Sequence, residues 1–459
     1  MINSTNKRIL EIFRAYDVRG LFPDQLNEDV AYAIGRALAS TIGKRSAVAV
    51  GRDVRSSSIA IHRALCDGIT AQGVNVIDLG EIPSPVLYFI TRSLELAAGA
   101  MITASHLPPN WNGIKFCDSR GIVISDGTGL EAIKQAVTSA EKYTGNRGKI
   151  HLYNKALVDY VKYVSERINI GRKLSVVFDY GNSVTANVVP LILAEFGLEC
   201  KQINTEQGNF RRSSELTSES MGDLKRTVLN TNSDLGIAYD ADGDRVGFVD
   251  NLGNIYPTGE SIIPIFASNA LALSKGEIII DVTCSSSISE FISQQGGTPV
   301  VIRVGHSYCA NEVLIRNALF GAQYSGHYSF PEMGCSDDAI FASLKMIEIL
   351  SRSERSLSQL VAGLPVSYAS KMVEVECPDS KKFLVVAAVS YKAKNMGYRV
   401  EEIDGVKIHS KRDDREWVLV RASNTSPIIR INADGKSRES SQDLLSLGVN
   451  LLVEVMHDN

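Results

Sequence analysis

The sequence predicts an α/β protein in which three similar domains with mixed or parallel sheets precede a smaller C-terminal α+β domain. Three stretches, which begin at Ala47, Ser175 and Glu277, share the order apolar strand, polar loop, amphipathic helix, glycine, second strand. Such units are joined by right-handed crossovers and build sheets with helices on both faces. The tail after Leu364 instead joins strands through hairpins between helices, which is typical of an α+β domain. At 459 residues the chain is also too long for one core, since domains hold roughly 100–200 residues.

The three stretches indicate a repeated domain. They are spaced by roughly one hundred residues, whereas the units of a solenoid repeat every roughly 20–50 residues. Strand–helix–strand units resemble one another in any α/β protein. The alternative to a repeated domain is therefore three unrelated α/β domains. We expect four domains with the limits 1–148, 149–254, 255–366 and 367–459.

Composition and charge argue against several classes of protein. A net charge of −4 without a basic stripe argues against a nucleic-acid partner. No apolar run approaches the roughly 18 residues of a membrane helix, and the N-terminus lacks the apolar core of a signal peptide. The 7 cysteines are scattered without a C-x-x-C pair, so we expect free thiols and a cytoplasmic protein.

The stretch TASHLPPNWNGIK, from Thr103 to Lys115, follows an apolar run that is typical of a buried strand. The strand gives way at once to Ser105 and His106, and then to a loop stiffened by two prolines. A strand end of this kind can present a nucleophile. It can equally be a turn in which Ser and Thr bond to the local backbone, and this stretch alone does not separate the two.

Three carboxylates, those of Asp240, Asp242 and Asp244, directly follow the apolar run LGIAY. Alternate residues of an extended backbone point to one side, so we expect these mutually repelling groups to surround a cation. An EF-hand loop is excluded, because its required glycine and acid are replaced by Arg245 and Asn251. Oxygen ligands that leave coordination positions open favour Mg²⁺, and a phosphoryl oxygen could fill such a position. A plain acidic turn or a calcium loop is the alternative.

Two further polar stretches lie downstream. In GAQYSGHYSF, the alternating Gln323, Ser325 and His327 offer groups suited to sugar hydroxyls. A polar loop with a structural histidine would have the same sequence pattern and is the alternative. In RASNTSPIIRI, a guanidinium and several short donors lie on one turn, as in metal-free phosphate sites. An ordinary Asn/Ser-rich turn is the alternative there. Near the N-terminus, Arg19 of FRAYDVRG could also reach a phosphate.

One such loop in each predicted domain, in this order, resembles the α-D-phosphohexomutase superfamily. The likeness covers essentially the whole chain and is closest to the phosphomannomutase/phosphoglucomutase branch, through FRAYDVRG, TASHLPPNWNGIKF, DADGDR, GHS, SGH and RASNTSP. It implies four domains around a central cleft. It also implies an enzyme, a monomer or homodimer, that interconverts the 1- and 6-phosphates of mannose and/or glucose, with a phosphoserine, Mg²⁺ and hexose 1,6-bisphosphate as intermediate and activator. Phosphoglucosamine mutase, a metal-dependent phosphatase and a non-catalytic sugar-phosphate binder are the alternatives.

The resemblance also implies a role for each site residue. Ser105 would carry the phosphate, and Mg²⁺ would be bound by Ser105, Asp240, Asp242 and Asp244. The transfer site would be lined by His106, Lys115, Arg245, Arg19 and His306, with Lys115 and His306 as acid/base candidates. The sugar would face Gln323, Ser325 and His327. The phosphate that is not transferred would be bound by Arg421, Ser423, Asn424 and Thr425.

Two positions depart from the pattern of this superfamily. Relatives usually read G-E-x-S-G-H where this chain has Ala322 and Gln323, and they usually carry a lysine at the position of Thr283. A glutamine keeps one acceptor oxygen but loses the strength that charge adds to a hydrogen bond. Both changes fall in the predicted sugar-binding domain. We therefore expect an active mutase with altered or weakened hexose selectivity.

Overall fold

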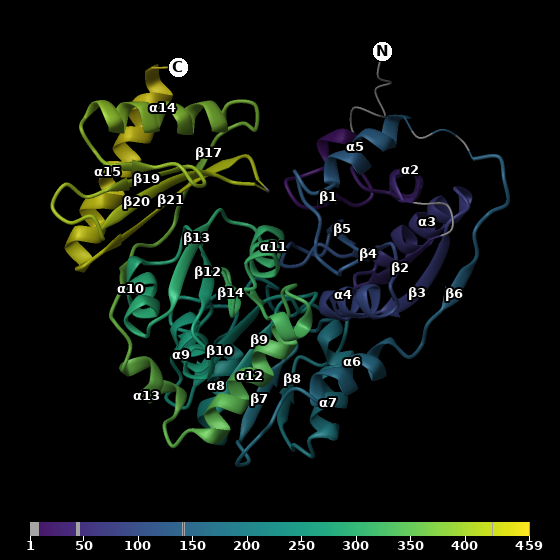
Figure 1. The fold of residues 1–459 in the computed structure, drawn as a ribbon, viewed down its shortest axis with the longest axis horizontal. Coiled ribbons are helices and arrows are strands. Elements are labelled where there is room, and N and C mark those ends of the chain that lie inside the picture. Colours follow the sequence, from purple (N-terminus) through teal and green to yellow (C-terminus); the bar gives the residue numbers. More distant parts are fainter. Residues whose placement is uncertain (1–8, 43–45, 140, 142, 425, 459) are drawn as a thin grey trace.

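The structure, a computed structural model, describes residues 9–42, 46–139, 141, 143–424 and 426–458. Figure 1 shows four lobes, each built on its own sheet. The first and fourth lobes carry the two chain ends and lie at the top of the view, and the second and third lie below them. We number these lobes as domains one to four in chain order.

The first domain is built on a six-stranded sheet in the order β1-β5-β4-β2-β3-β6. Its strands are β1 (Val18–Leu21), β2 (Ala47–Arg52), β3 (Asn75–Glu81), β4 (Ala98–Ile102), β5 (Trp111–Asp118) and β6 (Ile150–Leu152). Its helices are α2 (Glu28–Thr41), α3 (Ser58–Ala71), α4 (Ser84–Ser93) and α5 (Leu130–Ser139). Because side chains alternate along a strand, Val48 and Val50 of β2 join the core under α2, α3 and α5, while Ala49 joins the core under α4.

The second and third domains repeat this layout with shorter sheets. The second contains α6 (Ala156–Ser165), β7 (Val176–Asp179), the 3₁₀ turn η1 (Val184–Asn187), α7 (Val189–Glu195), β8 (Lys201–Ile203), α8 (Gly222–Thr231), β9 (Leu235–Tyr239), β10 (Val246–Asp250) and β11 (Ile255–Tyr256). The third contains α9 (Ile263–Leu273), β12 (Glu277–Asp281), α10 (Ser286–Gln294), β13 (Thr298–Ile302), α11 (His306–Arg316), β14 (Phe320–Ala322), β15 (Tyr328–Ser329), η2 (Pro331–Met333), α12 (Ala339–Arg352) and α13 (Leu357–Ala362).

The three sheets share one topology. In each, the first strand of the repeat (β2, β7 or β12) lies between the second and third strands and pairs with both in parallel. A fourth strand (β5, β10 or β15) then pairs with the third in antiparallel orientation. In each of these three domains, the polar loop with Ser105, with Asp240 to Asp244 or with Gln323 to His327 lies between the third and the fourth strand. The prediction of three similar α/β domains with mixed sheets is therefore confirmed.

The fourth domain is an antiparallel α+β unit, also as predicted. Its strands are β16 (Tyr368–Ala369), β17 (Val373–Glu376), β18 (Val400–Glu401), β19 (Val406–His409), β20 (Trp417–Ala422) and β21 (Ile428–Gly435), and its helices are α14 (Lys382–Asn395) and α15 (Arg438–Asp458). One continuous apolar core runs from α4 through the second and third domains, whereas the fourth domain has a core of its own. A small apolar cluster of Val282, Trp417 and Leu419 joins the fourth domain to the third.

Among the helices that the structure describes, none combines the length and the apolar character that crossing a membrane requires.

Candidate active site between four domains

Side chains from all four domains line one cavity of about 120 Å³. The lining includes Tyr16, Arg19, Ser105, His106, Lys115, Glu215, Asp244, Arg245, His306, Gln323, Ser325, His327, Arg421, Ser423, Asn424 and Arg430. The loops that follow β4, β9 and β14 meet here because the carboxyl ends of parallel strands form a crevice at one edge of a sheet. The cavity thus collects most of the side chains that the sequence singled out.

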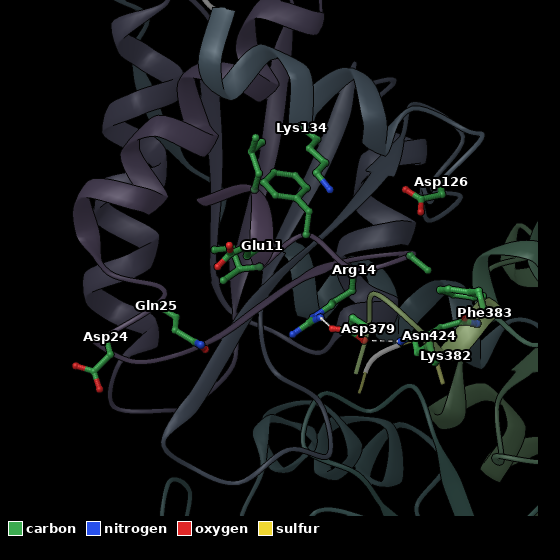
Figure 2. Close-up of a pocket in the computed structure, with 14 residues that line it drawn as sticks. Glu11, Arg14, Asp24, Gln25, Asp126, Lys134, Asp379, Lys382, Phe383 and Asn424 are labelled. Carbon is green, nitrogen blue, oxygen red and sulfur yellow. Dashed lines mark hydrogen bonds and ion pairs between the residues drawn. The ribbon is translucent and has the colours of Figure 1, made fainter. Parts of the chain in front are cut away.

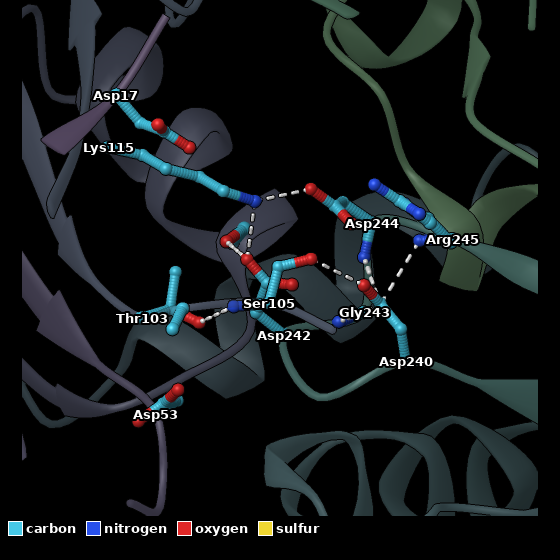
Figure 3. Close-up of polar contacts among 12 residues, drawn as sticks. Asp17, Asp53, Thr103, Ser105, Lys115, Asp240, Asp242, Gly243, Asp244 and Arg245 are labelled. Atoms are coloured by element: carbon cyan, nitrogen blue, oxygen red, sulfur yellow. Dashed lines mark hydrogen bonds and ion pairs between the residues drawn. The ribbon is translucent and has the colours of Figure 1, made fainter. Parts of the chain in front are cut away.

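Ser105 lies in the loop of residues 103–110, here called the Ser105 loop. The backbone of Ser105 has φ of 49°, in the left-handed region that costs a non-glycine residue about 1 kcal/mol or more. The Ser105 N–H donates to Thr103 Oγ1 at 2.9 Å, and the Ser105 hydroxyl donates to Asp240 Oδ2 at 2.9 Å (Figure 3). His106 Nδ1 lies 3.3 Å from the same hydroxyl oxygen. Burial, and then the nearby Arg245 and Arg19, hold the pKa of His106 well below its usual value, so this imidazole is neutral.

The loop of residues 240–245, here called the aspartate loop, is folded around Asp240. Its Oδ1 accepts the backbone N–H groups of Gly243, Asp244 and Arg245 at 3.0, 3.2 and 3.2 Å. Gly243 has φ of 74°, a conformation that suits glycine and closes the tight turn. Asp242 Oδ2 also accepts the Ser84 hydroxyl at 2.7 Å, which ties the loop to the first domain.

Lys115, on β5, provides the positive charge that the aspartate loop requires. Its Nζ donates to Asp242 Oδ2 at 2.6 Å and to Asp244 Oδ2 at 2.5 Å (Figure 3). Burial alone lowers the pKa of Lys115, but the two facing carboxylates outweigh it and hold that pKa well above its usual value. Burial, with the charges of Asp244 and Asp242, raises the pKa of Asp240 instead.

The aspartate loop also fits a divalent cation. Ligand atoms of Asp240, Asp242 and Asp244 all lie within 4.8 Å of one another. Among the described residues, the buried Asp242 Oδ1 and Asp244 Oδ1 have no hydrogen-bond partner. Unsatisfied buried carboxylate oxygens are costly without a partner, and they are the ligands that Mg²⁺ prefers. The site can therefore hold a metal.

The loop of residues 323–327, here called the glutamine loop, brings Gln323, Ser325 and His327 to the cavity. His327 Nε2 accepts from Arg245 Nε at 3.3 Å. In a neutral imidazole the other nitrogen then carries the proton, so Nδ1–H donates to Ser325 Oγ at 2.8 Å. Burial lowers the pKa of His327 against the opposing effect of Asp244, which agrees with this neutral form. Gln323 is 1% exposed, and its Nε2 has no partner within the described part of the chain.

His306 is the first residue of α11 and stacks on His327, with ring centroids 5.3 Å apart. Its Nδ1 lies 3.2 Å from Asp337 Oδ1, so the carboxylate accepts the Nδ1 proton. Tyr16 contacts the His306 ring edge-on at 5.4 Å. Asp337 therefore sets the tautomer of His306, with the proton on Nδ1.

Arg421 is the last residue but one of β20, and its cross-strand partner in the register of β20 and β21 is Arg430. Directly opposite residues of an antiparallel pair share a face, and each guanidinium here has one carboxylate partner, Asp404 Oδ2 at 3.4 Å from Arg421 Nη1 and Glu374 Oε1 at 3.0 Å from Arg430 Nε. Both arginines line the cavity, beside Ser423 and Asn424. Asn424 Nδ2 donates to Val304 O of the third domain at 3.5 Å. Thr425, also predicted for this turn, lies outside the described residues.

Several residues of the site were not found from the sequence: Tyr16, Asp337, Glu215 and Arg430. Arg430 had a usable signal, because it follows Arg421 in the same hairpin. Glu215 had none, since the Ser-rich stretch around it is typical of a solvated loop. Thr283, at one of the two departures, does not line the cavity; its N–H and hydroxyl both donate to Asp281 Oδ1.

A larger cavity of about 820 Å³ lies between the segment Leu10–Ala15 of the first domain and α14 of the fourth (Figure 2). Its lining holds none of Ser105, Asp240, Asp242 and Asp244, and Asn424 is the one described residue that lines both cavities. Arg14 Nη1 and Asp379 Oδ2 form an ion pair across it at 3.2 Å. Size alone therefore does not identify the site, because most of the predicted site residues line the smaller cavity.

Family models for phosphoglucomutase/phosphomannomutase match the chain in four consecutive parts. The α/β/α domains I, II and III match residues 10–144, 152–253 and 258–368, and the C-terminal domain matches residues 372–446.

Relatives cover nearly the whole chain. A phosphomannomutase/phosphoglucomutase of Pseudomonas syringae pv. tomato is 34% identical over 435 residues, which span 93% of this chain and 92% of the relative. A probable phosphoglucosamine mutase of Methanopyrus kandleri is 34% identical over 437 residues, 94% and 95% of the two chains. The crystal structure of a phosphoglucomutase/phosphomannomutase family protein from Burkholderia thailandensis superposes with a TM-score of 0.88 at 28% identity, covering 99% and 98%. The chain belongs to the phosphoglucomutase/phosphomannomutase family.

Proposed function

We propose that the chain is a Mg²⁺-dependent phosphohexomutase that interconverts the 1- and 6-phosphates of a hexose, mannose and/or glucose. Ser105 carries the phosphate, and a hexose 1,6-bisphosphate is the intermediate and activator. The observation that supports this best is the Ser105 hydroxyl, 2.9 Å from Asp240 in a cavity that an arginine pair also lines. One side of the cavity thus carries a reactive hydroxyl with a metal loop, and the other suits a second phosphate.

The proposed reaction exchanges one phosphorus–oxygen bond for another. A hydroxyl of the bound hexose phosphate attacks the phosphorus of phosphoserine, and the bond from phosphorus to Ser105 Oγ breaks. The hydroxyl proton passes to a base and a proton returns to Oγ, with Lys115 and His306 as the acid/base pair. The bisphosphate then turns over and gives its other phosphate back to Ser105. Positioning and charge neutralisation supply most of the rate in such transfers.

The residues of the aspartate loop neutralise the transferring group. Mg²⁺ bound by Asp240, Asp242, Asp244 and an oxygen of phosphoserine would offset the negative charge of the phosphoryl group. Arg19, Arg245 and His106 line the same side of the cavity and orient the phosphate by charge and hydrogen bonds. Because the cavity is enclosed by four domains, water is kept from the phosphoserine, whose hydrolysis would end the cycle.

The remaining residues bind the rest of the substrate, a small phosphosugar. Gln323, Ser325 and His327 contact the sugar hydroxyls, with the unused Gln323 amide as a donor. Arg421, Ser423, Asn424 and Thr425 bind the phosphate that is not being transferred, and we add Arg430 to this set. The protein acts as a monomer or homodimer.

A second candidate is phosphoglucosamine mutase. The relative from Methanopyrus kandleri that carries this name is as similar, at 34% identity, as the relative named phosphomannomutase/phosphoglucomutase. Gln323 lies in the part of the cavity that we assign to the sugar, so we expect it to influence whether the substrate is a phosphate of mannose, glucose or glucosamine.

A coupled assay distinguishes these candidates. The purified protein is given glucose 1-phosphate, mannose 1-phosphate or glucosamine 1-phosphate, with and without Mg²⁺, and formation of the 6-phosphate is followed. We expect activity only with Mg²⁺ and a bisphosphate, and none from Ser105→Ala. Mutase activity that survives Ser105→Ala would overturn the mechanism. Release of inorganic phosphate without 6-phosphate would instead show a phosphatase.

A further inference from the structure

Arg55 lies between β2 and α3, and its side chain fills the inside of the Ser105 loop. The side chain is 1% exposed, and it does not line the cavity described above. A buried guanidinium needs partners for its charge and for all of its N–H groups. The partners of Arg55 show what it does for the loop.

All five N–H groups of the Arg55 guanidinium are used. Nε donates to Asp53 Oδ2 at 3.1 Å. The other four donate to backbone carbonyls of the segment 105–111, namely Ser105 O at 2.8 Å, Leu107 O at 2.7 Å, Pro108 O at 2.7 Å and Trp111 O at 3.3 Å. One planar group therefore fixes the path of the whole loop, including the carbonyl of Ser105 itself.

The guanidinium is in turn held from two other directions. Asp53 Oδ1 accepts the backbone N–H of Arg55 at 3.0 Å and the Ser58 hydroxyl at 2.6 Å, while the backbone N–H of Asp53 donates to Ile102 O at the end of β4. The ring of Phe210, from the second domain, covers the guanidinium at 5.5 Å. Arg55 is thus rigidly placed relative to both the sheet and the neighbouring domain.

We propose that Arg55 is a positioning residue for phosphoryl transfer. By binding the Ser105 carbonyl it holds this residue in its left-handed conformation, with φ of 49°, so that Oγ points at Asp240. A lysine keeps the charge but lacks the planar set of donors, so it cannot bind four carbonyls at once. This inference rests on the proposed role of Ser105 and adds to it the group that sets the position of the hydroxyl.

The test compares Arg55→Lys and Arg55→Ala with Arg52→Lys, a matched control three residues away whose arginine pairs with Glu81 at the surface. We expect kcat of Arg55→Lys to fall about 100-fold, since a misplacement near 1 Å costs that much, with KM within about threefold. We expect guanidinium ion to restore part of the kcat of Arg55→Ala. The control should stay within about twofold of wild type.

Other outcomes contradict the proposal. Full kcat in Arg55→Lys would overturn it, as would a loss that only follows the folded fraction measured by circular dichroism, without guanidinium rescue. If both variants fail to fold, Asp53→Asn takes their place, because it weakens the support of Arg55 without removing Arg55 itself. A reduced kcat of Asp53→Asn at constant KM would support the proposal. An unchanged kcat would overturn it. An inactive wild-type protein would contradict the proposed function itself, which separates the two failures.

Discussion

The aspartate loop and the glutamine loop occupy the same turn of the repeated unit, between the third and the fourth strand, but their side chains are supported differently. Asp240 binds three N–H groups of its own loop, and Asp242 and Asp244 share the ammonium of Lys115. In the glutamine loop the donor of Gln323 has no partner among the described residues. His327 depends on Arg245 of the other domain.

This difference separates the residues proposed for phosphoryl transfer from those proposed to select the sugar. Side chains held by several partners lose little freedom on binding, so the aspartate loop is preformed, and the two oxygens without a hydrogen-bond partner among the described residues, Asp242 Oδ1 and Asp244 Oδ1, are left for a cation. A buried amide with an unused donor depends on the ligand for its last hydrogen bond, so changing it alters which ligand fits best. Both departures from the pattern expected for the superfamily lie in the third domain, but only Gln323 lines the cavity, so we expect it alone to alter selectivity directly.

The largest effect should come from the Ser105 loop, the third loop at this turn of the repeated unit. Ser105→Ala removes the oxygen that carries the phosphate, so we expect activity to fall about 10⁴-fold or more. The coupled assay measures the rate, and intact-mass spectrometry should find phosphate on wild type and none on the variant. Ser93→Ala, which removes only a hydroxyl bonded within α4, is the control and should keep both.

Breaking the aspartate loop should have the next largest effect. In Asp242→Asn one ligand charge is lost, and we expect activity and Mg²⁺ affinity to fall at least about 100-fold, since loss of an outer partner alone costs roughly 10–100-fold. Calorimetric titration with Mg²⁺ measures the affinity. Unchanged Mg²⁺ binding would remove Asp242 from the metal site.

Changing the glutamine loop should shift preference more than rate. In Gln323→Glu the acceptor gains charge and the donor is lost, so we expect the ratio of kcat/KM among glucose, mannose and glucosamine phosphates to change by about tenfold. The Mg²⁺ dependence should stay the same. A constant ratio among the three sugars would show that Gln323 does not select the hexose.

The smallest effect is expected outside the loops, at the ion pair between Arg14 and Asp379. The two side chains are 23% and 49% exposed, so solvent screens the pair and its worth is about 0–1 kcal/mol. Arg14→Gln and Asp379→Asn should each change KM by about threefold or less. The difference in KM between each variant and wild type should become smaller at high salt. A double-mutant cycle measures the coupling, and a kcat loss as large as that of Asp242→Asn would contradict a peripheral role.

Much of this arrangement could be predicted from the sequence, because local patterns carry it. The strand–loop–helix repeat follows from hydrophobic order, and Ser105, Asp240 and Arg421 each stand directly after an apolar run. Contacts between distant segments could not be predicted: Arg55 reaches the Ser105 loop 50 residues away, and Asp337 reaches His306 31 residues away. The roles of the site residues and the domain limits 1–148, 149–254, 255–366 and 367–459 stay predictions.

The shared position of the three loops has a consequence for the history of the molecule. A chain made by duplicating one unit would begin with three equivalent turns facing a common centre, each at the carboxyl end of the same strand. Divergence could then give one copy the nucleophile, one the metal ligands and one the sugar contacts without building a new crevice. The fourth domain, with its separate core and antiparallel sheet, lies outside this repeat, and the phosphate loop proposed for it would have a separate origin.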